Sequence, residues 1–246
     1  MNRAVPAVFK PEYEAPLVRE FFRDRPRGFF VEVGANDPKK DSQSYHLEEA
    51  GWTGILVEPL PELAAELRRQ RTAQVFEVAC SSPDRSGQTM RLHVAGPFSS
   101  FDPNLAVTGM RADRVIDVKV RTLDEVLNEG RTPVPIDLMS VDVEGHELEV
   151  LSGFDFARWK PRLVLLEDHV SSLDKHRFMT RAGYSLMRRT GLNGWYVPRA
   201  DAPAMDLLGR WQIFRKYYLA LPFRKFRDAR RRLRDRIRFR HQDAER

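Results

Sequence analysis

Residues 29–37 read FFVEVGAND, an apolar run that meets a glycine and then turns polar. A short apolar run bounded by glycines, here Gly28 and Gly34, is typical of a strand buried on both faces of a parallel sheet. Gly34 permits a sharp turn and close approach of a ligand to the backbone. Ligands of open parallel sheets bind beyond the carboxyl ends of the strands, so this turn is a candidate binding site. It lacks the three glycines of a dinucleotide-binding turn, which argues against hydride transfer.

Outward from this segment, short apolar runs alternate with patterns typical of amphipathic helices. Strands are expected over residues 54–57, 75–79, 88–94, 115–120, 136–143 and 163–166. Helices are expected over residues 12–27, 42–50, 61–71, 122–128, 146–151 and 174–182. Two further strands, 184–187 and 195–197, are predicted to pair across a glycine turn. This order predicts an α/β fold with a mostly parallel sheet, helices on both faces and a C-terminal β-hairpin.

The length of 246 residues suits one catalytic domain, residues 1–200, with a tail over residues 201–246. Residues 96–113 contain several glycines and prolines and are predicted to form a loop that covers the site. The single cysteine, Cys80, excludes an intrachain disulfide, which fits a reducing compartment. Neither a signal-peptide pattern nor a run of 18 apolar residues is found. We therefore expect a cytoplasmic protein.

The positive charge of the chain is concentrated in the tail. Residues 210–246 hold 14 Lys or Arg against 4 Asp or Glu, whereas the rest holds 27 against 31. Arginines alternate there with aromatic residues, which predicts a basic amphipathic helical tail suited to an anionic membrane surface, with the protein peripheral on its inner face. The alternatives are packing on the domain itself or on a second subunit of a homo-oligomer. Nucleic acid is the least favoured partner.

The second predicted strand also ends in an acid, Glu58, which lies 26 residues after Glu32. A carboxylate at that position can accept hydrogen bonds from both hydroxyls of a ribose. Its alternative role is a favourable charge at the N-terminus of the following helix. Together with the Gly34 turn, Glu58 indicates a cofactor that contains adenosine.

Acidic residues cluster again in residues 140–147, which read SVDVEGHE where a buried strand meets a helix. Strand alternation places Asp142 and Glu144 on the same side, so both are expected to face one cleft. Two close carboxylates raise the pKa of one of them or hold a cation. The alternative is a helix cap with a solvated first turn.

These segments resemble the FkbM family of S-adenosylmethionine-dependent O-methyltransferases. The resemblance spans residues 28–170 and rests on FVEVGAN (30–36), GILVEP (54–59) and VDVEGHE (141–147). It implies a Rossmann-like class I methyltransferase fold for residues 1–200. It also implies that S-adenosylmethionine is the cofactor and that the substrate is a hydroxyl of a glycan, a glycolipid or a related natural product. The implied cofactor-binding residues are Glu32, Gly34, Asn36, Glu58, Ser81 and Asp142, with Glu58 on the ribose and Ser81 near the adenine.

Methylation of a sugar hydroxyl requires removal of its proton. The candidate catalytic bases are Asp142 and His146, followed by His169. A second route is a magnesium ion, held by Asp142 and by Asp168 or His169 as in catechol-type O-methyltransferases, which would lower the pKa of the hydroxyl. Two alternative functions remain open: a non-catalytic adenosine-binding or membrane-docking module, and, less favoured, a nucleic-acid methyltransferase.

Overall fold

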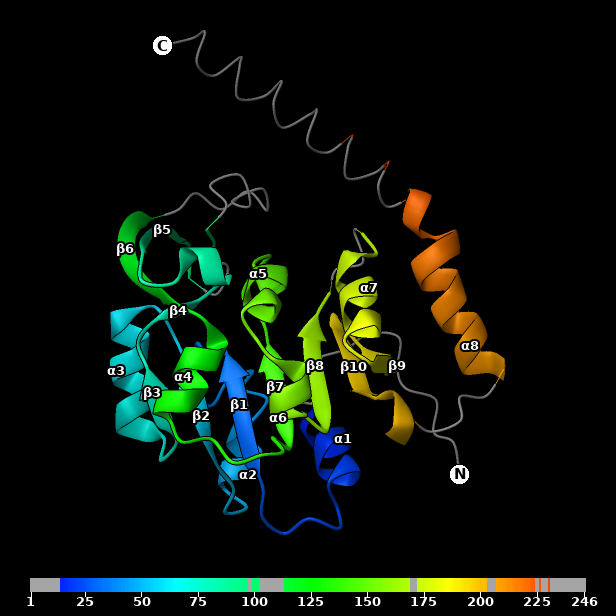
Figure 1. Cartoon of the computed structure of the whole chain (residues 1–246), viewed down its shortest axis with the longest axis horizontal. Helices are drawn as coiled ribbons and strands as arrows, with labels where there is room; N and C mark the ends of the chain where they lie inside the picture. The colour runs from blue at the N-terminus through cyan, green and yellow to red at the C-terminus, as the bar shows by residue number, and fades with distance from the viewer. Residues whose placement is uncertain are drawn as a thin grey trace, which may run out of the picture.

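The computed structural model describes residues 14–96, 99–101, 113–168, 172–202, 207–223, 226 and 230. Within these residues seven strands form one large sheet in the order β3-β2-β1-β7-β8-β10-β9 (Figure 1). The strands are β1 (Phe29–Val33), β2 (Thr53–Val57), β3 (Gln74–Phe76), β7 (Leu138–Val141), β8 (Leu163–Glu167), β9 (Tyr184–Thr190) and β10 (Asn193–Pro198). Only β10 runs against its neighbours, because it pairs antiparallel with both β8 and β9. The α/β fold, the parallel sheet and the closing hairpin are thus confirmed.

The order of strands reverses between β1 and β7. The chain steps from β1 outward to β2 and β3 and then returns to place β7 on the other side of β1. The register puts Val33 of β1 beside Val57 of β2 and Val141 of β7. The turns after these three strands therefore meet at one edge, where ligands of such sheets bind.

Helices cover both faces of the sheet, as predicted. One face carries α4 (Leu123–Glu129), α5 (Glu147–Ser152), α6 (Phe156–Trp159) and α7 (Asp174–Arg181), and the other carries α1 (Glu14–Phe21), α2 (Tyr45–Glu48) and α3 (Pro61–Gln70). Alternation along β1 supplies both cores: Val31 and Val33 pack in the first, and Phe30 packs in the second.

A second, three-stranded sheet lies above the carboxyl ends of β1 and β2, at the upper left of Figure 1. Its strands are β4 (Ala79–Cys80), β5 (Thr89–Val94) and β6 (Arg114–Arg121), in the order β4-β6-β5. The single strand predicted over residues 75–79 is therefore divided between two sheets. Thr122 caps helix α4 as predicted, through a capping box in which Thr122 Oγ1 accepts from the Glu125 amide at 3.2 Å.

Two predicted helices are shorter than expected. The first predicted helix is reduced to α1, and the second to the four residues of α2. Residues 42–44 stay outside α2 because they bind the Glu32 carboxylate. The predicted covering loop lies largely outside the described residues.

The chain continues from the hairpin through a 3-10 turn (Arg199–Asp201) to α8 (Leu207–Phe214) and a π-helical turn, η5 (Arg215–Leu219). Figure 1 shows α8 beside the β9 edge of the sheet. Tyr217 and Leu221 are buried against the core that contains α7. None of the helices in the described part of the chain is long and apolar enough to cross a membrane. Most of the predicted tail beyond these elements lies outside the described residues.

Candidate active site

A cavity of about 460 Å³ opens at the edge where the strand order reverses. Its walls are the turns after β1, β2 and β7, the end of β8 and part of the small sheet. This volume lies in the range of small-molecule sites. Separate segments contribute to its lining, among them those of Gly34, Glu58, Cys80, Phe101, Asp142 and Glu167.

The floor of the cavity is a contact between two backbone turns. Gly34 has φ of +82°, and a Cβ added there would lie 1.8 Å from the carbonyl oxygen of Asp142. The Gly34 amide also donates to the Val57 carbonyl at 2.9 Å. Only glycine fits this position, because φ is positive and the Asp142 carbonyl leaves no room for a Cβ.

Glu32 organises the loop that follows this turn. Its carboxylate accepts from Ser42 Oγ at 2.9 Å, from the Gln43 amide at 2.8 Å and from Ser44 Oγ. Glu32 is buried and still lines the cavity. It therefore fixes the loop and adds negative charge to the cavity wall.

The Glu58 carboxylate connects the turn after β1 to the turn after β2. One carboxylate oxygen accepts from the Asn36 amide and the other from the Leu60 amide, both at 2.9 Å. Burial raises the pKa of Glu58, and the two backbone hydrogen bonds oppose that rise. Each oxygen keeps a further lone pair for a ligand hydroxyl. Asn36 itself has φ of +49° and also lines the cavity.

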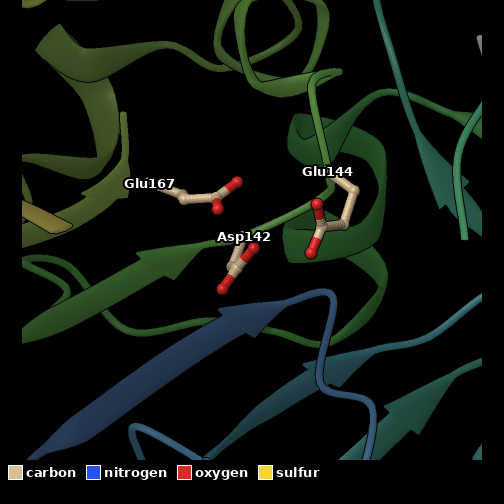
Figure 2. A group of neighbouring side chains, drawn as sticks. All are labelled: Asp142, Glu144 and Glu167. Atoms are coloured by element: carbon tan, nitrogen blue, oxygen red, sulfur yellow. The ribbon is translucent and has the colours of Figure 1, made fainter. Parts of the chain in front are cut away.

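Three carboxylates face one another across the cavity end of β7 and β8. Asp142, Glu144 and Glu167 place one oxygen each within 4.8 Å of the others (Figure 2). Asp142 is exposed to the cavity, but surrounding protein still desolvates it. Burial and the charge of Glu167, followed by those of Glu144 and Glu147, raise the pKa of Asp142 well above its usual value. The cluster can therefore hold a proton or attract a cation.

The turn that carries this cluster is conformationally restricted. Glu144 has φ of +50° and Gly145 has φ of +97°. A left-handed glutamate is uncommon and costs free energy, and such residues concentrate at functional sites. Ser100 Oγ donates to the Glu144 carbonyl at 3.0 Å, which joins the turn to the far wall.

His146 and Ser81 contact each other rather than the cavity. Ser81 Oγ lies 2.9 Å from His146 Nε2, and both residues are buried. The lining residue Phe101 packs on the His146 ring at 4.9 Å between centroids. Burial lowers the pKa of His146, so the neutral ring is favoured. Among the described residues, neither belongs to the set that lines the cavity.

Asp168, predicted to share a metal ion with Asp142, is outside both the described acidic group that contains Asp142 and the cavity lining. Its Oδ2 accepts from Arg189 Nη1 at 3.2 Å and from the Tyr217 hydroxyl at 3.0 Å. Glu167, the last residue of β8, takes the place beside Asp142. The other predicted residue at this strand end, His169, lies outside the described residues.

Two charged residues at or beside the acidic cluster, Glu167 and Lys175, are absent from the sequence-based prediction of site residues. Glu167 ends a buried apolar strand, as Glu32 and Glu58 nearly do, and that pattern is the signal that identifies it. No comparable pattern in the sequence around Lys175 of α7 indicates a role in the site. Lys175 Nζ donates to the Glu167 carbonyl at 2.9 Å and pairs with the Glu147 carboxylate, which joins α5 and α7 to the end of β8.

The model of the methyltransferase FkbM domain matches residues 32–186, more than half of the chain. The chain belongs to the FkbM methyltransferase family. In this FkbM methyltransferase the matched range contains the Gly34 turn, Glu58, the acidic cluster and Glu167, while α8 lies beyond it.

One relative is the hexuronic acid methyltransferase AglP of Haloferax volcanii. It is 36% identical over 74 residues, which cover 28% of this chain and 30% of that protein. The match thus spans less than a third of the length of this relative. Among solved structures, the precorrin-6y C5,15-methyltransferase of Geobacter metallireducens GS-15 aligns with a TM-score of 0.39 and 13% identity, over 79% of this chain and 91% of that one.

Proposed function

We propose that this FkbM methyltransferase transfers the methyl group of S-adenosylmethionine to a hydroxyl of a glycan or a related substrate. The observation that carries the proposal is the convergence of the Gly34 turn, Glu58 and the acidic cluster on one cavity at the strand-order reversal. The name of the relative AglP, a hexuronic acid methyltransferase, supports a sugar as the acceptor.

The chemistry of the cavity fits this cofactor. Glu58 presents acceptor oxygens for the ribose hydroxyls, and the Gly34 turn leaves room for the methionine end. The apolar side chains Leu63, Val78 and Leu92 offer a surface for the adenine ring. The carboxylates of the cavity are suited to the positive charge of a sulfonium and of an ammonium group.

The acidic cluster supplies the base. Bound S-adenosylmethionine supplies an already electrophilic methyl carbon, so the protein must align the acceptor oxygen, exclude water and remove the hydroxyl proton. Asp142 faces the cavity and has a raised pKa, which brings it toward the range in which a carboxylate is an effective base. Burial raises that pKa most, and the charges of Glu167 and Glu144 raise it further.

A magnesium ion is the second candidate for activating the hydroxyl. It is favoured by the three carboxylate oxygens of Asp142, Glu144 and Glu167, the ligand type that magnesium prefers. A strong chelator distinguishes the two routes. Turnover that survives the chelator favours the base, and turnover that is lost and returns with magnesium favours the metal.

The cofactor is tested by calorimetric titration with S-adenosylmethionine and S-adenosylhomocysteine. We expect micromolar binding that weakens about 10- to 100-fold in Glu58→Ala, because charged hydrogen bonds are lost. The matched control is Glu49→Ala, an exposed acid after α2 outside the set that lines the cavity. Folded protein that binds neither ligand would exclude the proposal. Cofactor binding without methyl transfer to any glycan would instead favour a non-catalytic adenosine-binding module.

A further inference from the structure

The helix formed by α8 and η5 has apolar side chains on two sides. Its inner side contacts the domain through Ile213, Tyr217 and Leu221, which repeat every four residues. The Tyr217 hydroxyl accepts from Arg189 Nη1 at 2.5 Å and donates to Asp168 Oδ2. The helix is thus attached to the carboxyl end of β8, and the apolar side chains on its inner side are already packed against the domain.

Beside this inner side the helix carries a second group of apolar residues, two of which, Phe214 and Tyr218, also line a cavity of about 320 Å³ against α7 and β9. Trp211, Phe214 and Tyr218, which we call the aromatic face, are 52%, 45% and 49% exposed. Their rings contact in series, with centroids 5.9 Å and 5.6 Å apart. Farther along the chain, Phe223 and Phe226 are 77% and 66% exposed. A contiguous exposed group of large aromatic side chains marks an interaction surface.

The positive charge around the aromatic face favours a negatively charged binding partner. Arg210 and Arg215 are exposed beside the aromatic face, and residues 210–246 carry a net charge of +10. A second copy docked through the same face would bring two such segments together, which like-charge repulsion opposes. An anionic bilayer surface offers the opposite charge to the arginines and an interfacial layer that aromatic rings prefer.

We propose that the aromatic face docks this protein on an anionic phospholipid surface, with Trp211, Phe214 and Tyr218 in the interfacial layer and the arginines on the headgroups. The docking does not depend on the proposed methyl transfer.

Tryptophan fluorescence provides a direct test on the full chain. Of the four tryptophans, Trp52, Trp159 and Trp195 are at most 3% exposed, so Trp211 dominates any response to added vesicles. Vesicles of phosphatidylcholine mixed with phosphatidylglycerol should shift its emission to shorter wavelength, because the ring leaves water. Vesicles of phosphatidylcholine alone should bind weakly, and added salt should weaken binding to the mixed vesicles by screening.

The double variant Phe214→Ser with Tyr218→Ser keeps the Trp211 reporter. Its partition onto mixed vesicles should be at least ~10-fold weaker, because two interfacial anchors are removed. The matched control, Val115→Ser with Val134→Ser, removes apolar groups of similar exposure elsewhere and should bind as the wild type does. Unchanged cofactor affinity and thermal unfolding in both variants establish that they are folded.

Four outcomes would overturn the proposal. The double variant could bind vesicles as well as the wild type does, or both vesicle types could bind equally. Alternatively, sedimentation could show a dimer that the double variant loses while vesicles bind neither protein, which would make the aromatic face an interface between copies. A Trp211 response to RNA with none to vesicles would likewise assign the face to nucleic acid. Cofactor binding is measured separately, so none of these results would contradict the proposed methyl transfer.

Discussion

Asp142 is the residue on which the proposed chemistry of the cavity depends. It follows a buried strand, faces the cavity and has the carboxylates of Glu144 and Glu167 nearby. A carboxyl whose pKa is raised stays protonated over a wider range of pH, and only the deprotonated form can act as a base. Activity should therefore fall as the pH is lowered through the raised pKa of Asp142.

Glu167→Gln tests this coupling. Removing one negative charge should lower the pKa of Asp142, so the acid limb of the profile of kcat/KM against pH should move down by about one pH unit. Asp142→Asn should lower kcat at least ~100-fold, because the base is absent. A profile that stays in place in Glu167→Gln, with the exposed Glu129→Gln as control, would show that the two carboxylates do not titrate together.

At the scale of elements, the loop that follows β1 is held by an arginine at the end of α3. Arg71 donates to Glu48 Oε2 at 2.6 Å, to the Pro38 carbonyl at 2.9 Å and to Ser44 Oγ at 2.9 Å. Ser44 in turn binds Glu32. Arg71 is buried and touches none of the groups proposed to react, so it is a positioning residue for the loop.

Arg71→Met should raise KM for the cofactor about 10-fold, because the loop that lines the cavity loses charged hydrogen bonds. The value of kcat should change less, since the base is untouched. Arg69→Met, an exposed arginine on the same helix, is the control and should leave both constants unchanged. A fall in kcat with no change in KM would contradict the positioning role.

The elements that could be predicted from the sequence are those with a strong apolar pattern. The strand cores and the Thr122 cap depend on neighbouring residues, so local patterns suffice for them. Helix α2 is shorter than predicted because Ser42 and Ser44 bind a carboxylate ten and twelve residues away. The choice between Glu167 and Asp168 depends on where β8 ends, and pairing of Glu167 with Asn193 of β10 decides that. The serine contacts that shorten α2 leave no local pattern, whereas an acid at the end of an apolar strand is a local signal for Glu167.

At the scale of the whole molecule, Glu14 connects the two ends of the domain. This 1% exposed acid of α1 accepts from Thr190 Oγ1, from Asn193 Nδ2 at 2.8 Å and from Trp195 Nε1 at 2.9 Å. It also accepts from Gln43 Nε2 at 3.0 Å. The first described helix, the closing hairpin and the cavity loop therefore share one buried carboxylate.

Glu14→Ala should lower the free energy of unfolding by about 2 to 4 kcal/mol, because several buried donors lose their acceptor. Glu20→Ala on the same helix breaks only an exposed ion pair with Arg23. It should change the free energy of unfolding by less than about 0.5 kcal/mol. Denaturant unfolding of both variants measures the difference. Equal midpoints for the two variants would show that the hairpin does not depend on α1.

The backbone contact between Gly34 and the Asp142 carbonyl limits how the cavity can be redesigned. The floor consists of backbone atoms, which a side-chain substitution does not remove. Gly34 itself has no room for a side chain. A substitution at Asp142 therefore alters the charge of the cavity while its floor keeps the same shape. Engineering for a different acceptor is best directed at the opposite wall, where Leu92 and Phe101 present side chains that can be exchanged.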